Sequence, residues 1–183
     1  MHTIPYTRFG IPDGYSYRYT QYAPAVNAVI AGFARNARPR VGRLFFRAHG
    51  DELFRAFPVG DDKESHESCR CSASTEWVYY LTDECRELGN EDSRWWISLN
   101  RYSPLADKAE VLIEKNGLQL LTACDRPWIA DIVSIAADDE SLDLRVGLDT
   151  PTETGYRMDY FIMRFDLKRQ TMTSRMKLLG ARL

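Results

Sequence analysis

The most constraining feature of the sequence is a repeated alternation of apolar and polar residues between Trp77 and Leu179, interrupted by polar turns. A side-chain period of two indicates antiparallel β-strands. The clearest unit is 111–115, Asn116-Gly117 and 118–122, because Asn-Gly supplies the two positive φ angles that a type I′ hairpin turn requires. The sequence therefore predicts a mainly β protein.

The same pattern predicts about ten consecutive strands. A short strand is expected around Tyr15, Tyr17 and Tyr19, with one aromatic face, and a hairpin is expected on either side of His49-Gly50-Asp51. Such an antiparallel meander avoids bare edges by closing into a barrel or by forming a strongly curved sheet or a sandwich. The later strands are predicted at 76–81, 94–101, 109–115, 118–123, 129–136, 142–148, 156–165 and 171–179.

Two N-terminal segments depart from this alternation. The apolar residues of 23–38 recur at helical spacing behind Pro24, and Pro39 prevents continuation, so we predict one N-terminal amphipathic helix there. Residues 60–75 are polar, without a period and long for a connection, which predicts a mobile loop.

A chain of 183 residues suits a single domain, 1–183, with 1–40 as an N-terminal strand and helix packed on a β body at 41–183. No apolar signal segment is found at the N-terminus, and no apolar run reaches the length of a membrane span. We therefore expect a soluble, cytoplasmic protein whose four cysteines are free thiols.

Charge is distributed unevenly along the chain. The first 58 residues contain eight arginines, no lysine and three acidic residues, a balance of +5, whereas the whole chain carries −2. This part either docks beside an acidic body or presents arginines to an anionic partner. The near-neutral whole argues against nonspecific binding of nucleic acid. The candidate anion-binding or partner-binding residues are Arg35, Arg38, Arg40 and Arg43.

Signals for catalysis or metal binding are weak. Zinc-ligand residue types occur at His66, Cys69, Cys71 and Cys85, but a single Cys-x-Cys lacks the spacing of a structural site. His49 could activate a cysteine thiol only if the fold brought them together. The sequence contains none of the common nucleotide-binding or hydrolase motifs, and we assign no catalytic residue, metal or cofactor.

The predicted strands are rich in aromatic residues, which mostly form core. If the β body is a barrel with an unfilled interior, some of them line a cavity, as in calycin-type architectures. Our first hypothesis is therefore a non-catalytic protein that holds an apolar or aromatic small molecule. The alternatives are a cytosolic protein-interaction module (inhibitor, adaptor or immunity-type) and an enzyme with a Cys/His or carboxylate site in the barrel mouth. The candidate ligand-binding residues are Trp96, Ser98, Asn100, Tyr160 and Arg164.

Overall fold

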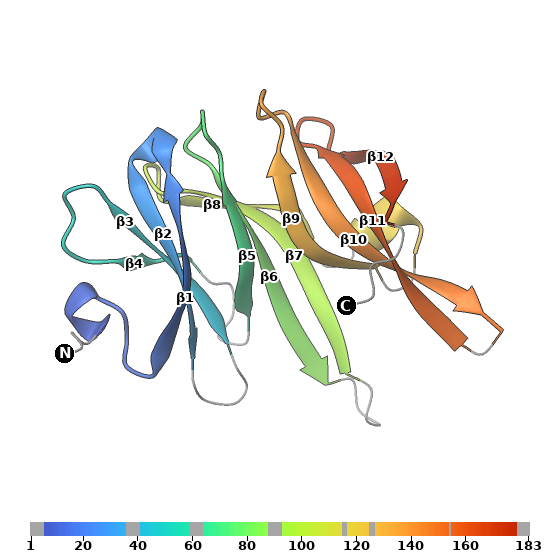
Figure 1. The fold of residues 1–183 in the computed structure, drawn as a ribbon, viewed down its shortest axis with the longest axis horizontal. Coiled ribbons are helices and arrows are strands. Elements are labelled where there is room, and N and C mark those ends of the chain that lie inside the picture. Colours follow the sequence, from blue (N-terminus) through green and yellow to red (C-terminus); the bar gives the residue numbers. More distant parts are fainter. Residues whose placement is uncertain are drawn as a thin grey trace.

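The computed structural model describes residues 6–35, 41–58, 64–87, 93–114, 117–124, 127–153 and 155–178. It contains twelve strands in three antiparallel four-stranded sheets (Figure 1). The predicted mainly β, antiparallel class is confirmed. A closed ten-stranded barrel is not found in the described part of the chain, since the strands divide into separate sheets.

Each sheet is a meander in which strands that follow one another in sequence are neighbours. The first sheet contains β1 (Tyr15–Ala23), β2 (Ala28–Arg35), β3 (Gly42–Ala48) and β4 (Arg55–Ala56). The second contains β5 (Ser65–Cys71), β6 (Val78–Glu87), β7 (Ser93–Ser103) and β8 (Lys108–Ile113). The third contains β9 (Pro127–Ile135), β10 (Ser141–Thr152), β11 (Gly155–Asp166) and β12 (Thr171–Lys177). The helices of the described residues are short: η1 (Tyr6–Phe9), η2 (Pro24–Val26) and α1 (Gly117–Thr122).

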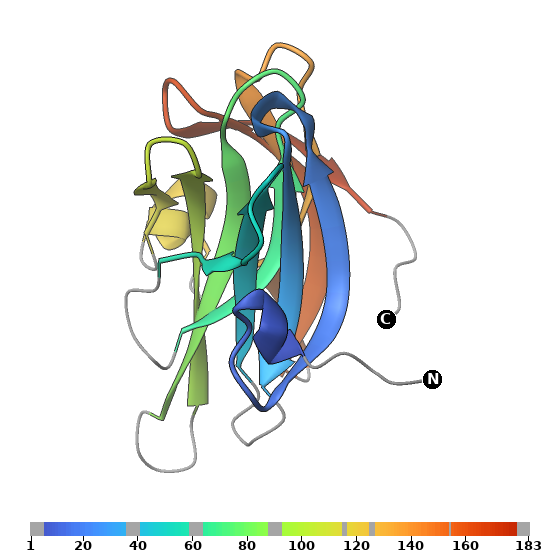
Figure 2. The ribbon, with the colours of Figure 1, turned by 90° about the vertical axis from the view of Figure 1, so that its left-hand side faces the viewer.

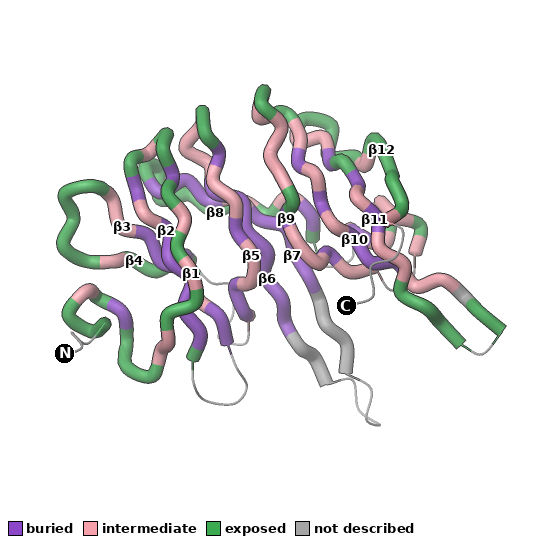
Figure 3. The backbone as a smooth tube through the Cα atoms, viewed as in Figure 1, coloured by how far each residue is buried: buried purple, intermediate pink, exposed green. Residues whose placement is uncertain are grey.

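The second sheet lies between the other two and is buried on both faces. Val78 and Tyr80 pack against the first sheet, whereas Tyr79 and Leu81, which alternate with them on β6, pack against the third. Figure 3 shows the resulting concentration of buried residues along β6 and β10. Alternate residues of β6 therefore belong to two different cores, and both faces of the strand are buried.

The first strands of the three sheets lie side by side (Figure 1). The Tyr19 hydroxyl donates to the Glu67 carbonyl at 2.8 Å, and the Gln21 amide donates to the Cys69 carbonyl at 2.9 Å. The constant offset of 48 residues shows that β1 and β5 run parallel. On the other side of β5, Asp131 of β9 accepts a hydrogen bond from Ser68. Side chains and not a backbone ladder thus join the sheets along this edge.

The predicted helix at 23–38 is wrong for the described residues. Residues 24–26 form a single 3₁₀ turn, Asn27 follows with a left-handed φ of 46°, and β2 then begins at Ala28. The misleading helical spacing arises because Ile30 faces the second sheet while Phe33 packs on the opposite face, so that both faces of β2 are apolar. A strand buried on both sides loses its polar alternation.

The predicted hairpin at Asn116-Gly117 and the strand at 118–123 are also wrong. Gly117 begins α1, while Asn116 lies outside the described residues. Leu118 is fully buried and Leu121 half-buried in the core between the second and third sheets. Packing of these leucines outweighs the local preference of Asn-Gly for a turn.

The predicted loop at 60–75 is wrong over 65–71, which forms β5; residues 59–63 lie outside the described residues. Polar side chains are buried in this strand because they bind the backbone of the first sheet. Ser65 Oγ accepts the Gly42 N–H at 2.7 Å, and His66 Nδ1 accepts the Leu44 N–H at 3.1 Å. A polar sequence can therefore occupy a central position. The expected β3–β4 hairpin is confirmed.

Candidate functional site

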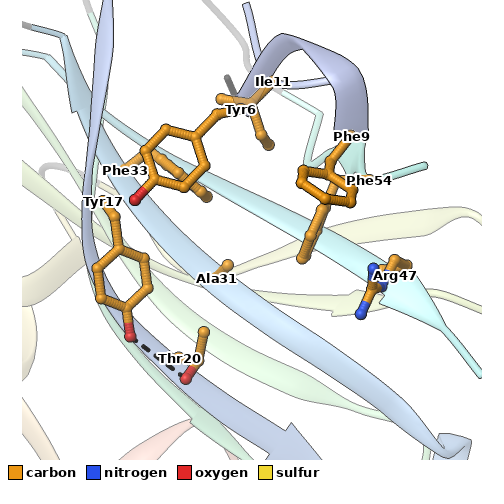
Figure 4. Close-up of a pocket in the computed structure, with 9 residues that line it drawn as sticks. All are labelled: Tyr6, Phe9, Ile11, Tyr17, Thr20, Ala31, Phe33, Arg47 and Phe54. Carbon is orange, nitrogen blue, oxygen red and sulfur yellow. Dashed lines mark hydrogen bonds between the residues drawn. The ribbon is translucent and has the colours of Figure 1, made fainter. Parts of the chain in front are cut away.

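An aromatic pocket of about 220 Å³ lies on the face of the first sheet that points away from the second sheet (Figure 4). Strands β1, β2 and β3 form its base, and η1 lies in front of the sheet (Figure 2). We refer to it as the outer pocket. Its lining residues are Tyr6, Phe9, Ile11, Tyr17, Thr20, Ala31, Phe33, Arg47 and Phe54.

A β-bulge in β1 determines which tyrosines face the outer pocket. Tyr17 is opposite Phe33, but the next paired residue is Tyr19, opposite Gly32, so Arg18 is an extra residue. Tyr17 consequently stays on the outer face while Tyr19 turns toward the second sheet. The prediction that three alternating tyrosines share one face is therefore wrong for Tyr19.

Glycine is required opposite Tyr19. A Cβ atom at Gly32 would lie 2.7 Å from the Tyr19 ring, which is closer than real contacts allow. The phenol of Tyr19 is anchored by its bond to the Glu67 carbonyl, and burial raises its pKa well above the usual range. Tyr19 thus holds β1 in place from the face of the sheet that is opposite the outer pocket.

Phe33 is the centre of the aromatic wall. It makes edge-to-face contacts with Tyr6 at 5.3 Å and with Tyr17 at 5.9 Å between ring centroids, and is itself buried. Edge-to-face pairs are favourable because the positive rim of one ring meets the negative face of the other. Tyr6 and Tyr17 remain about half exposed, at 45% and 47%, so that the outer surface of the wall is open to a ligand.

The segment that covers the sheet is held by backbone contacts. Phe54 N–H donates to the Phe9 carbonyl at 2.7 Å, and Ile11 is fully buried. Gly10, between them, has φ of +83°, and a Cβ there would lie 2.8 Å from the Phe54 carbonyl oxygen. Only glycine fits this close approach, which places Phe9 and Phe54 together on one side of the outer pocket (Figure 4).

Arg47 is the one charged residue among the nine that line the outer pocket. Its guanidinium carbon lies 5.0 Å from the centroid of the Phe54 ring, a cation–π contact. No ion pair to Arg47 is found among the described residues. Asp51, four residues on, is paired with Arg55 at 3.0 Å. Across the opening, the Tyr17 hydroxyl lies 3.4 Å from Thr20 Oγ1.

The structure separates the ligand-binding residues predicted from sequence. Ser98 and Asn100 are buried on β7, and Asn100 donates to Thr82 at 3.1 Å and lines a second pocket of about 270 Å³. Tyr160 and Arg164 belong to β11 in the third sheet. Arg164 is bound to Asp143 at 2.8 Å. The two groups do not share a pocket within the described residues, and the side chain of Trp96 lies outside them.

The predicted arginine group is only partly described. Arg38 and Arg40 lie outside the described residues. Strand register places Arg35 opposite Tyr15 and Arg43 opposite Phe33, so both begin on the outer face of the first sheet. Arg43 donates to the carbonyls of Gly42 and Glu64. Arg47 was not among the predicted residues. A sequence signal for it exists, because alternate residues of a strand share a face and Arg47 follows Arg43 by four positions.

Three of the zinc-ligand residue types noted in the sequence, His66, Cys69 and Cys71, lie on β5. Burial lowers the pKa of His66 to about 3, helped by the positive charge of Arg43, so this imidazole is neutral. Burial raises the pKa of Cys69 to about 11 and that of Cys71 to about 12, so both thiols stay protonated near pH 7 and are poor nucleophiles. Among the described residues, no cluster of histidine, cysteine and acidic side chains could hold a metal ion.

No protein-family model matches the sequence. No curated protein matches it either. Within the described residues, none of the helices has the length and apolar character to cross a membrane.

Proposed function

We propose that this protein binds a small aromatic or apolar molecule in the outer pocket. The supporting observation is the composition of the lining, in which five aromatic rings surround a floor made by the small side chain of Ala31 (Figure 4). Ligand pockets are concave and mostly apolar with a few polar groups. From the sequence, the ligand was expected inside a barrel, whereas the site proposed here is the outer pocket on one face of the first sheet.

The volume limits the size of the ligand. A dry cavity of about 150 Å³ holds a benzene molecule, and pockets for drug-sized ligands begin near 300 Å³. At about 220 Å³, the outer pocket suits a compound with one aromatic ring and a short substituent. With about ten non-hydrogen atoms at roughly 0.5 kcal/mol each, binding amounts to about 5 kcal/mol, a Kd of roughly 0.2 mM.

Ligand-observed saturation-transfer NMR with millimolar phenol and indole tests this proposal. The wild-type protein should transfer saturation to at least one of them, and Ala31→Leu should abolish the transfer by filling the floor. Ala106→Leu is the matched control, because Ala106 is exposed in the turn before β8. Thr20→Phe blocks the opening from an exposed position and so avoids strain in the core. Absence of transfer from the wild type to either compound would refute the proposal, as would transfer from both pocket variants that equals transfer from the wild type.

A second candidate function is the binding of a partner protein, and the β10–β11 hairpin favours it. The outer ends of these strands project beyond the body of the molecule (Figures 1 and 3). Tyr156 is 71% exposed and Met158 is 40% exposed there. Native mass spectrometry of the protein purified from its own host distinguishes the two functions, because it separates a retained small molecule from a retained partner chain.

A further inference from the structure

We infer that the ligand of the outer pocket carries a carboxylate next to its ring and that Arg47 binds this carboxylate. The inference rests on the proposed function and narrows it to small aromatic carboxylates. It depends on three observations: the ionic partners of the arginines, the charge of the surrounding segment and the position of Arg47 relative to the rings.

Several arginine side chains among the described residues form ion pairs with an acidic side chain. Arg55 binds Asp51 at 3.0 Å, Arg70 lies 3.6 Å from Asp131, and Arg101 binds Glu110 at 2.5 Å. Arg47 instead contacts the Phe54 ring and has no acidic partner among the described residues. A half-buried guanidinium without a counter-ion keeps its donors available for a ligand anion.

The electrostatic environment also favours an anion. The first 58 residues carry eight arginines against three acids. Asp51 and Arg55 form an ion pair and cancel, which leaves seven arginines against two acids, an excess of +5. A surface with an excess of one sign of charge raises the local concentration of oppositely charged small molecules.

The positively charged side chain of Arg47 lies at the edge of the space that the ring of a ligand would occupy. In Figure 4, Arg47 and Phe54 lie on one side of the opening, and Tyr17 and Thr20 lie on the other. A ring that sits over Ala31 therefore has its substituent near the guanidinium, whose planar fork matches a carboxylate with two parallel N–H···O bonds. The Tyr17 and Thr20 hydroxyls, which share a hydrogen bond at 3.4 Å, are polar groups on the opposite side of this opening.

The test compares phenylacetate with phenylacetamide, which has the same shape and no charge. Isothermal titration calorimetry at low ionic strength and pH 7 should show about a ten-fold preference of the wild type for phenylacetate, as expected for a charge-assisted bond at a half-exposed site. Arg47→Gln should weaken binding of phenylacetate about ten-fold and so remove the preference for phenylacetate over phenylacetamide.

Arg175→Gln is the matched control, because Arg175 also stacks on an aromatic ring, with its guanidinium carbon 3.8 Å from the Phe161 centroid, but lies in the third sheet. It should retain the wild-type preference. Equal binding of both compounds by the wild type would overturn this inference and leave the proposed function standing. A preference that persists in Arg47→Gln would also overturn it. Failure of both compounds and of phenol and indole to bind would refute the proposed function itself.

Discussion

Replacement of Asp83 by asparagine should stabilise the protein above neutral pH. Asp83 lies on β6 with only 8% of its surface exposed, and its Oδ1 atom has no hydrogen-bond partner in the described structure. Burial, and to a smaller extent the negative charge of Glu67, raise the pKa of this carboxyl from 3.8 to about 7, although hydrogen bonds from its own backbone and from Ser65 act in the opposite direction. The folded protein therefore holds a proton on Asp83 at a pH where the unfolded chain has lost it.

The sign and size of the effect follow from linkage. Between about pH 4 and pH 7 the native state binds more protons than the unfolded state, so the free energy of unfolding falls as the pH rises. At about 1.4 kcal/mol for each tenfold change in proton affinity, the rise in pKa corresponds to an upper bound of about 4 kcal/mol. Residual solvation reduces this value, and we expect a loss of roughly 2–3 kcal/mol between pH 5 and pH 8.

Urea unfolding at pH 5, 6, 7 and 8 measures this difference. The gap in unfolding free energy between Asp83→Asn and the wild type should grow with pH and favour the variant at pH 8. Asp143→Asn is the contrasting control, because the hydrogen bonds from Arg164 and Ser134 lower the pKa of Asp143. Its removal should destabilise the protein by an amount that stays constant from pH 5 to pH 8, because Asp143 is ionised in both the folded and the unfolded state over this range. A gap for Asp83→Asn that stays constant from pH 5 to pH 8 would refute the reasoning.

Three further substitutions test the packing. Gly32→Ala should destabilise the protein by about 1–3 kcal/mol in urea unfolding, since the new methyl group meets the anchored Tyr19 ring; an unchanged midpoint would contradict that packing. His66→Phe should cost about 1–3 kcal/mol at pH 8 by leaving the Leu44 N–H without an acceptor. This cost should shrink as the pH falls from 7 to 5, because the unfolded chain protonates this histidine near its ordinary pKa of 6.5 whereas the folded protein keeps it neutral; a cost that stays constant over this range would show that the pKa of His66 is not lowered by folding. Leu118→Ala should lower thermal stability by about 2–5 kcal/mol if α1 packs in the core, whereas a cost below 1 kcal/mol would place α1 outside it.

The strands with one wet face are the part of the fold that apolar–polar alternation predicts most directly. In β10, the buried Leu142, Leu144 and Val146 alternate with Asp143 and Arg145, and this strand was predicted. β2 could not be identified in this way, because both of its faces are apolar and its residues also fit a helical spacing. β5 was not predicted for the opposite reason: its buried side chains are polar, and they bind backbone groups of another sheet.

Only Tyr17 of the residues that line the outer pocket was singled out from the sequence. Register places Tyr15, Arg35 and Arg43 on the same face of the sheet, although they do not line the pocket. The wall formed by η1 and Phe54 could not be foreseen, because it depends on contacts between segments more than forty residues apart. The bulge in β1 also lacks a sequence signal, since Arg18 continues a regular alternation.

The adjacency of the three first strands has a consequence for how the chain unfolds. Because each backbone ladder closes within its own stretch of chain, an outer sheet can detach without breaking a ladder, by giving up one apolar interface and side-chain bonds such as those of Tyr19, His66 and Ser68. We therefore expect amide hydrogen exchange to reveal separate cooperative units, with the most slowly exchanging protons in β6 and β7. A molecule held against β1, β2 and β3 would then slow exchange in those strands first and would leave β10 and β11 unaffected.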